Sequence, residues 1–283
     1  MALDPIGSPR AVLVTGGGTG IGAAVARKLA AAGDRVAVCG RRQDLLRAVA
    51  AETGGLGLTC DVSDASQVSA MVEEVIRRFG QLDGLVINAG VISPGGVAEL
   101  AMADWEEMVS VNLTGAFLVA RAALDHLIRR RGAIVSIASV AALRAASGMG
   151  GYAATKAGLT MLTQSIAVDQ AHLGLRANVV CPGWTVTEMA DREMAEFGAE
   201  RGIAAADAYR LVTALVPQRR PASAEEVAAV VAWLLSPEAS YVNGAVISVD
   251  GAATPVDIGT VAFDPRVSLS AAPAGTSTPS PDR

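Results

Sequence analysis

Two side chains suited to acid/base chemistry, Tyr152 and Lys156, stand four residues apart in a stretch whose composition predicts a helix. This spacing places both on one helix face, one turn apart. A nearby ammonium favours phenolate and is expected to lower the tyrosine pKa from its usual value of about 10. The pair therefore predicts a general acid/base. Alone, it is also typical of a solvated helix edge, so its interpretation depends on the rest of the chain.

A cluster of glycines lies between the first β-branched run, residues 11–15, and a helical stretch, residues 23–32. Glycines let a backbone approach a diphosphate, and the following helix offers free N–H groups and its positive dipole end to anionic oxygens. A glycine cluster by itself is often only a sharp turn, but between a strand and a helix it favours nucleotide binding. The residues predicted to contact the nucleotide here are Gly16, Gly18, Thr19, Gly20, Ile21 and Gly22.

The second predicted strand, residues 35–39, ends in Gly40, which Arg41 and Arg42 follow. Dinucleotide-binding folds often place an acidic residue here to bind the adenosine ribose, and this chain has none. A guanidinium matches a 2′-phosphate in charge and in geometry. The arginines therefore predict a preference for NADP(H). The alternative is a solvated helix start, although two cations at that end oppose the helix dipole.

Small or polar residues follow the later strands as well. Ligands of parallel sheets bind at these carboxyl ends, and core packing explains such residues poorly. Asn112 lies within a long helical region, residues 104–131, where a buried amide needs a partner. The strand-end residues are Asp61 and Val62, Asn88, Ala89 and Gly90, Ser139, and Pro182 and Gly183.

The alternation of about seven strands with six helices predicts a single α/β domain. We expect a doubly wound, Rossmann-type parallel seven-stranded sheet with helices on both faces. It should span residues 10–253, with a lid at about 188–216, after an N-terminal extension over 1–9. A C-terminal extension over 254–283 becomes rich in Pro, Ser, Ala and Thr, so we expect it to be disordered from about residue 259.

Composition narrows the class of protein. Hydrophobic residues make up 51% and aromatic residues 4%, which suits a core of small aliphatic side chains under a parallel sheet. A net charge of -5 with scattered signs disfavours nucleic-acid binding. Cys39, Cys60 and Cys181 lack metal-ligand spacing and are expected to be reduced core thiols. Without an apolar run resembling a signal peptide or a membrane span, we expect a soluble, cytoplasmic protein with no membrane contact.

In these motifs, and in their order and separations, residues 10–253 resemble the short-chain dehydrogenase/reductase family. The resemblance rests on the glycine turn, Asn88-Ala89-Gly90, Asn112, Ser139, the Tyr152 and Lys156 pair, and Pro182-Gly183. It implies that Tyr152 is the catalytic acid and that Lys156 lowers its pKa and binds the nicotinamide ribose. It also implies that Ser139 hydrogen-bonds the substrate oxygen and that Asn112 holds a water in a proton relay.

The same resemblance implies the remaining contacts with the cofactor. Asp61 and Val62 would meet adenine, Asn88 the adenosine side, and Thr187 the carboxamide, with Pro182, Gly183 and Thr185 beside it. Where the family often has a basic residue, this chain has Thr19, so NADP(H) preference depends on Arg41 and Arg42. A homotetramer is also implied, and no metal is needed.

A segment of 34 residues separates Pro182 from Pro217 and resembles the lid of aromatic polyketide ketoreductases. Trp184, Met189 and Met194, together with Phe197 and Tyr209, are predicted to line a wide apolar cleft, although they could equally pack the lid. We therefore expect NADPH-dependent reduction of a bulky ketone, such as a polycyclic polyketide intermediate. A 3-oxoacyl thioester reductase or a general secondary-alcohol dehydrogenase would share every motif. A non-catalytic NADP(H)-binding sensor is a further alternative.

Overall fold

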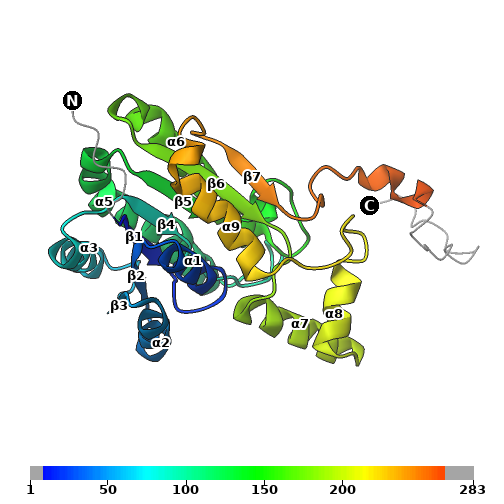
Figure 1. The fold of residues 1–283 in the computed structure, drawn as a ribbon. Helices are drawn as coiled ribbons and strands as arrows, with labels where there is room; N and C mark the ends of the chain where they lie inside the picture. Colours follow the sequence, from blue (N-terminus) through cyan, green and yellow to red (C-terminus); the bar gives the residue numbers. More distant parts are fainter. Residues whose placement is uncertain (1–8, 265–283) are drawn as a thin grey trace, which may run out of the picture.

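The centre of the molecule is a parallel seven-stranded sheet with the strand order β3-β2-β1-β4-β5-β6-β7 (Figure 1). This computed structural model describes residues 9–264. Neighbouring strands are all parallel, so each connection crosses over a face of the sheet. The predicted doubly wound fold is confirmed. The strands are β1 (Ala11–Thr15), β2 (Arg35–Gly40), β3 (Leu56–Thr59), β4 (Gly84–Ile87), β5 (Ala133–Ile137), β6 (Arg176–Pro182) and β7 (Val246–Val249).

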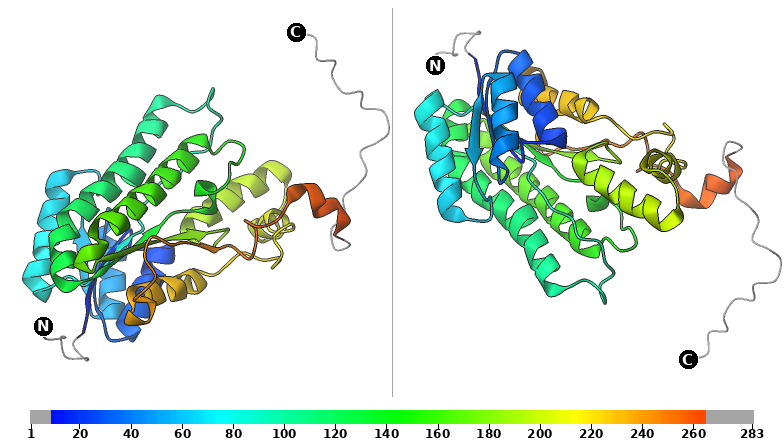
Figure 2. Two further views of the ribbon diagram at one scale, coloured as in Figure 1. Left: turned by 90° about the horizontal axis from the view of Figure 1, so that it is seen from above. Right: turned by 90° about the horizontal axis from the view of Figure 1, so that it is seen from below.

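Helices cover both faces of the sheet (Figure 2). One layer contains α1 (Gly20–Ala31), α2 (Gln43–Thr53) and α9 (Ala224–Leu235). The other contains α3 (Ala65–Phe79), α5 (Ala116–Arg130), preceded by α4 (Met102–Met108), and α6 (Gly150–Gln170). Two helices, α7 (Glu188–Arg201) and α8 (Ala205–Val212), pack on each other and stand apart from both layers. Short 3-10 turns complete the chain: η2 (Val140–Ala142), η3 (Ala171–Leu173) and η4 (Pro237–Ala239).

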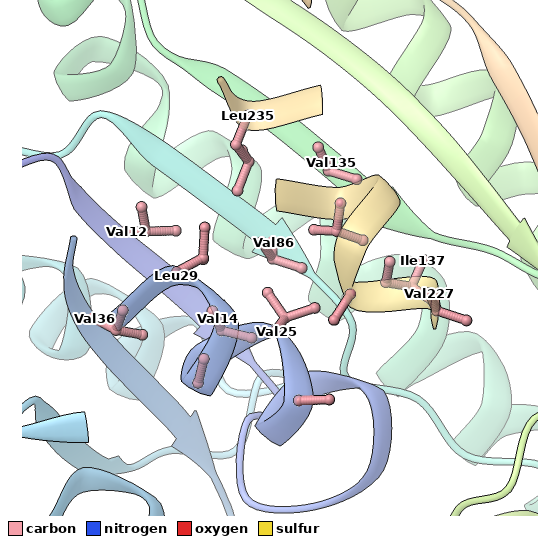
Figure 3. Packing of buried hydrophobic residues seen from close by; sticks show 14 of the residues in the cluster. Val12, Val14, Val25, Leu29, Val36, Val86, Val135, Ile137, Val227 and Leu235 are labelled. Atoms are coloured by element: carbon pink, nitrogen blue, oxygen red, sulfur yellow. The ribbon is translucent and has the colours of Figure 1, made fainter. Parts of the chain in front are cut away.

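Two apolar clusters, one on each face, hold these layers together. Val12 and Val14 of β1 pack toward α1 and α9, with Val25, Leu29 and other aliphatic side chains around them (Figure 3). Leu13, which alternates with them, belongs to the cluster under α3, α5 and α6. Each fully buried aliphatic side chain contributes about 1.5–3 kcal/mol. The sheet is therefore a firm platform whose carboxyl edge can position other side chains.

The predicted long helix over 104–131 contains a π-helical segment, η1 (Val109–Gly115), between α4 and α5. Such segments are rare and occur frequently at functional sites. Asn112 lies at the middle of η1 and is fully buried. Within residues 9–264, the stretch Met102–Arg130 is long and apolar enough to cross a membrane, but 44% of its most apolar window is buried inside the protein. A core helix can pass the same test of length and hydropathy, so the finding is weak evidence for a membrane span.

The C-terminal segment departs from the prediction at one point. A 3-10 helix, η5 (Ile258–Phe263), occupies residues for which disorder was expected. The Asp257 carboxylate accepts a 2.9 Å hydrogen bond from the Gly259 N–H group and so caps this helix. Local capping of this kind leaves no apolar periodicity in the sequence, so composition alone does not indicate this short helix. The predictions for residues 1–8 and 265–283 lie outside the described residues.

Candidate active site

The glycine turn after β1 leads directly into α1 and requires glycine at defined points. Gly16 and Gly20 have φ angles of 62° and 51°, in the left-handed region that favours glycine. A Cβ on Gly22 would lie 2.4 Å from the Gly16 carbonyl oxygen. At the end of β4, the Asn88 Nδ2 donates to the carbonyls of Thr15 and Gly16 at 2.9 and 3.1 Å. Asn88 thus braces the turn that faces the predicted nucleotide site.

A cleft of about 650 Å³ runs from this turn along the ends of β2 and β3. An open cradle of glycines beside a helix N-terminus fits the diphosphate of a nicotinamide dinucleotide. Gly22 lies beneath the turn, whereas Pro182, Gly183 and Thr185 line an adjoining cleft. The predicted cofactor residues in the first cleft are Gly16, Gly18, Thr19, Gly20, Ile21, Arg41, Arg42, Asp61, Val62, Asn88, Ala89, Gly90 and Thr187.

Both arginines predicted to bind a 2′-phosphate face a carboxylate. Arg42 forms a two-point ion pair with Glu188 at the start of α7, with N–O distances of 2.6 and 2.8 Å. The Arg41 Nη1 lies 3.7 Å from the Glu107 carboxylate. The arginine side chains are 53% and 60% exposed, so each pair contributes at most about 1 kcal/mol. A doubly charged phosphate can therefore compete with these carboxylates.

Asp61 stands where β3 ends and lines the same cleft. Its Oδ1 accepts hydrogen bonds from the Ser63 hydroxyl at 2.7 Å and the Ser63 N–H at 2.9 Å. These bonds lower the pKa of Asp61 and keep the carboxylate ionised. An ionised carboxylate is the acceptor that the predicted contact with an adenine amino group requires.

Tyr152 and Lys156 lie in the first two turns of α6, as the helix prediction requires. Lys156 is only 3% exposed, and its Nζ donates a 2.9 Å hydrogen bond to the Ile137 carbonyl oxygen at the end of β5. The same Nζ is 5.7 Å from the centre of the Tyr152 ring. A Cβ on Gly90, after β4, would lie 3.3 Å from this nitrogen. The ammonium is thus enclosed by two strand ends and the tyrosine.

The proton affinities of this pair differ from the prediction. Burial raises the pKa of Tyr152 to about 12, although interaction with the Ser139 hydroxyl acts to lower it. Burial also lowers the pKa of Lys156 to about 8. The expected lowering of the tyrosine pKa by Lys156 is therefore wrong for this structure. Loss of water around the phenol raises the tyrosine pKa, while the Lys156 ammonium is hydrogen-bonded to the Ile137 carbonyl.

Asn112 reaches the site through its neighbours. Its Oδ1 accepts from the Val91 N–H at 2.8 Å, and its Nδ2 donates to the Val91 carbonyl at 2.9 Å and to the Thr155 Oγ1 at 3.0 Å. The Thr155 hydroxyl donates in turn to the Tyr152 carbonyl at 2.8 Å. Both amide N–H groups are therefore engaged. The Asn112 side chain holds the backbone around Tyr152 and does not offer a free N–H group to the water that the resemblance implies.

Three hydroxyl side chains complete the predicted set. The Ser139 Oγ accepts a 3.1 Å hydrogen bond from the Ala141 N–H, which places it just beyond β5. The Thr185 Oγ1 donates to the Gly183 carbonyl at 3.1 Å. The Thr187 Oγ1 accepts from the Ala190 N–H at 3.2 Å and so caps α7. Thr187 lines both clefts and fixes the start of α7 beside them.

The second cleft has a volume of about 1000 Å³ and contains Ser139, Tyr152 and Lys156. Trp184 and Met189 line it as predicted. Met194 does not: it is 2% exposed and lies in the lid interior. Met194 belongs to α7, which packs against α8.

Two further lid aromatics also have other contacts. The Phe197 ring packs under the Arg201 guanidinium, 3.8 Å from its centre, and the Tyr209 hydroxyl donates to Asp191 at 2.9 Å. Neither lines the second cleft. Sequence reasoning missed Arg144, Glu193 and Thr254, which do line it. Each lies outside the recognised motifs, and the tail composition argued against assigning Thr254 a place in the fold.

Comparisons with known proteins agree with this geometry. A family model described as enoyl-(acyl carrier protein) reductase matches residues 16–254. The chain belongs to the short-chain dehydrogenase/reductase family. Protein MoaE of Klebsiella aerogenes is 41% identical over 90% of this chain and 99% of its own length. Levodione reductase of Leifsonia aquatica is 37% identical, over 86% and 93% respectively.

A solved structure supports the more specific resemblance. A variant of actinorhodin polyketide ketoreductase, determined with NADPH, is 35% identical with a TM-score of 0.84, and the match covers 88% of this chain and 98% of that one. As a short-chain dehydrogenase/reductase, the protein is an oxidoreductase of small molecules that uses a nicotinamide cofactor. The similarity to the polyketide ketoreductases confirms the branch that the sequence predicted.

Proposed function

We propose that this enzyme is an NADPH-dependent carbonyl reductase that acts on a bulky ketone. The observation that carries the proposal is the position of Tyr152 where two clefts join. Gly90 lines both clefts and lies beside the Lys156 ammonium, and Ser139 and Tyr152 line the larger one. A cofactor in the smaller cleft and a ketone in the larger would meet at this point.

The side chains at the junction suit carbonyl reduction. A bound nicotinamide would supply the hydride to the carbonyl carbon, so that negative charge develops on the oxygen. Tyr152 protonates this oxygen, since its raised pKa keeps the hydroxyl protonated at neutral pH. Ser139 donates a second hydrogen bond as the charge develops. Lys156, when charged, stabilises the phenolate that Tyr152 becomes.

Arg41 and Arg42 support the choice of NADPH over NADH. Both line the smaller cleft at the end of β2, where the adenosine ribose of a dinucleotide lies in this fold. A 2′-phosphate would replace the exposed carboxylates of Glu107 and Glu188 as their partner. The NADPH in the related actinorhodin ketoreductase structure agrees with this assignment.

The larger cleft supports a bulky substrate. Its volume of about 1000 Å³ is at the upper end of the range typical of small-molecule sites. Trp184 and Met189 contribute apolar surface on the side of α7. We assign α7 and α8 as the lid over this cleft. Levodione reductase and a polyketide ketoreductase among the relatives are consistent with a cyclic or polycyclic ketone.

We also propose a cytoplasmic homotetramer. Phe117 of α5 and Met161 and Val168 of α6 are 46%, 63% and 79% exposed, which suits helix faces that a second copy covers. The free, buried thiols at Cys39, Cys60 and Cys181 suit a reducing compartment. Light scattering on the purified protein tests the assembly, and a monomeric mass would contradict it.

The reaction is tested with Tyr152→Phe and a panel of ketones. We expect the wild type to oxidise NADPH with bicyclic and polycyclic ketones. Tyr152→Phe should lose about 100-fold or more in kcat while retaining NADPH binding, measured by cofactor fluorescence. Tyr241→Phe is the matched control, because the Tyr241 side chain is fully exposed.

Two results would contradict the proposal in different ways. Turnover confined to short 3-oxoacyl thioesters would exclude the bulky ketone. Unchanged activity in Tyr152→Phe would exclude the mechanism.

A further inference from the structure

The larger cleft is lined by Arg144, one of whose guanidinium nitrogens is buried without a hydrogen-bond partner among residues 9–264. Arg144 lies between η2 and α6, on the cleft wall that also holds Ser139. Its backbone N–H donates to the Val140 carbonyl at 3.0 Å, which anchors the loop. Its side-chain Nη2 is buried and has no hydrogen-bond partner among the described residues. Within residues 9–264, no carboxylate lies close enough to form an ion pair with it.

Arg144 as a whole is half-buried, but a guanidinium nitrogen that is removed from water without a hydrogen-bond partner is unfavourable. Two other charged side chains that line this cleft, Arg220 and Glu193, come from other parts of the chain. Arg220 is held by Glu226 through two contacts of 2.7 Å. Glu193 is the acidic side chain on the lid side, and burial raises its pKa, with Arg192 acting to lower it. Among the described residues, no ion pair joins Glu193 to Arg144.

A second orphaned group lies in the same cleft. The Thr254 Oγ1 is buried and has no partner among the described residues. Its backbone N–H donates to the Asp250 carboxylate at 2.7 Å, which fixes the residue after β7. Buried polar groups are normally hydrogen-bonded, and exceptions call for an unseen ligand or water. Two such exceptions, one of them cationic, mark a polar subsite within a mostly apolar cleft.

We propose that Arg144 binds a carboxylate on the ketone substrate and that the Thr254 hydroxyl donates to the same group. This inference rests on the proposed carbonyl reduction and narrows its substrate class to ketones that bear a carboxylate. A guanidinium offers two parallel N–H donors that match the two carboxylate oxygens. The apolar wall at Trp184 and Met189 then holds the carbon skeleton, and Ser139 and Tyr152 hold the ketone oxygen.

The test uses a matched pair of bicyclic ketones, a tetralone carboxylate and the corresponding tetralone carboxamide. We expect the wild type to have a KM about 10- to 100-fold lower for the carboxylate, in line with a charge-assisted hydrogen bond. Arg144→Gln should abolish this preference by raising the carboxylate KM at least tenfold more than the carboxamide KM. Arg144→Lys should retain part of it. Arg47→Gln, an exposed arginine on α2, makes the same charge change away from both clefts.

Binding is measured separately by calorimetry, with tetralin carboxylate and tetralin carboxamide added to the protein saturated with NADP⁺. Carboxylate binding that depends on Arg144 supports the subsite, even if neither tetralone is reduced. A lack of reduction would refute only the proposed carbonyl reduction. Equal affinity for the two compounds, or equal loss of both in Arg144→Gln, would overturn the subsite and indicate that water satisfies Arg144.

Discussion

Replacing Lys156 with methionine should stabilise the protein while removing its activity. Lys156 is 3% exposed, and burial lowers its pKa from 10.5 to about 8. At about 1.4 kcal/mol for each pH unit, the buried charge costs about 3 kcal/mol at neutral pH. The variant also loses the 2.9 Å hydrogen bond to the Ile137 carbonyl, which subtracts about 1 kcal/mol. We therefore expect a net gain of about 2 kcal/mol at pH 7.

The dependence on pH separates this reasoning from an ordinary packing effect. Below about pH 8 Lys156 is charged in both the folded and the unfolded chain, and the full cost of burial applies. Between about 8 and 10.5 the unfolded chain binds more protons than the folded protein, so wild-type stability rises with pH relative to the variant. The stabilisation by Lys156→Met should therefore shrink across this window.

The assay is urea unfolding of the cofactor-free proteins, followed by circular dichroism at several pH values between about 7 and about 10. Lys28→Met is the matched control, since Lys28 is the other lysine of the chain and is exposed on α1. Its effect on the free energy of unfolding should be small at every pH. A difference between Lys156→Met and wild type that stays constant with pH would refute the argument.

The same pKa values and ion pairs lead to two further predictions. The kcat/KM for ketone reduction should fall above about pH 8 because Lys156 loses its proton there, whereas Tyr152, with a pKa of about 12, stays protonated. A kcat/KM that stays constant up to about pH 10 would contradict this prediction. Arg42→Gln should weaken NADPH binding about tenfold and leave NADH binding unchanged. Glu188→Gln should strengthen NADPH binding, because it removes the carboxylate that pairs with Arg42. Fluorescence titration with both cofactors measures the second effect, and equal losses for NADPH and NADH in Arg42→Gln would refute the assignment.

Much of the fold could be predicted from sequence because its signals are local. Strands buried on both faces are apolar throughout, and the helices between them repeat every three to four residues. Parallel strands bring their carboxyl ends to one edge, so the residues after β1, β4 and β5 had to meet there. This is why the sequence alone predicts that Gly16, Asn88 and Ser139 lie near Tyr152.

The sequence alone did not predict how far each functional side chain is buried from water. Whether burial or a neighbouring charge controls the Tyr152 pKa depends on water excluded by distant segments, and the structure favours burial. The π segment around Asn112 has no distinct sequence pattern, because its backbone differs from an α-helix by a single residue in the turn. Likewise, only the tertiary structure shows that Met194 is buried and does not line the larger cleft.

The sequence by itself therefore determined the sheet, the family and the order of the catalytic groups, since these depend on periodicity and on fixed spacings along the chain. Tertiary structure decided which side chains share a cleft and which of them lack a partner. Arg144 and Thr254 are 110 residues apart in sequence and belong to no recognised motif. Both nevertheless line the same cleft, and each has one buried polar atom without a hydrogen-bond partner among the described residues. Their common feature is a missing hydrogen bond, which becomes visible only when every neighbour in space is known.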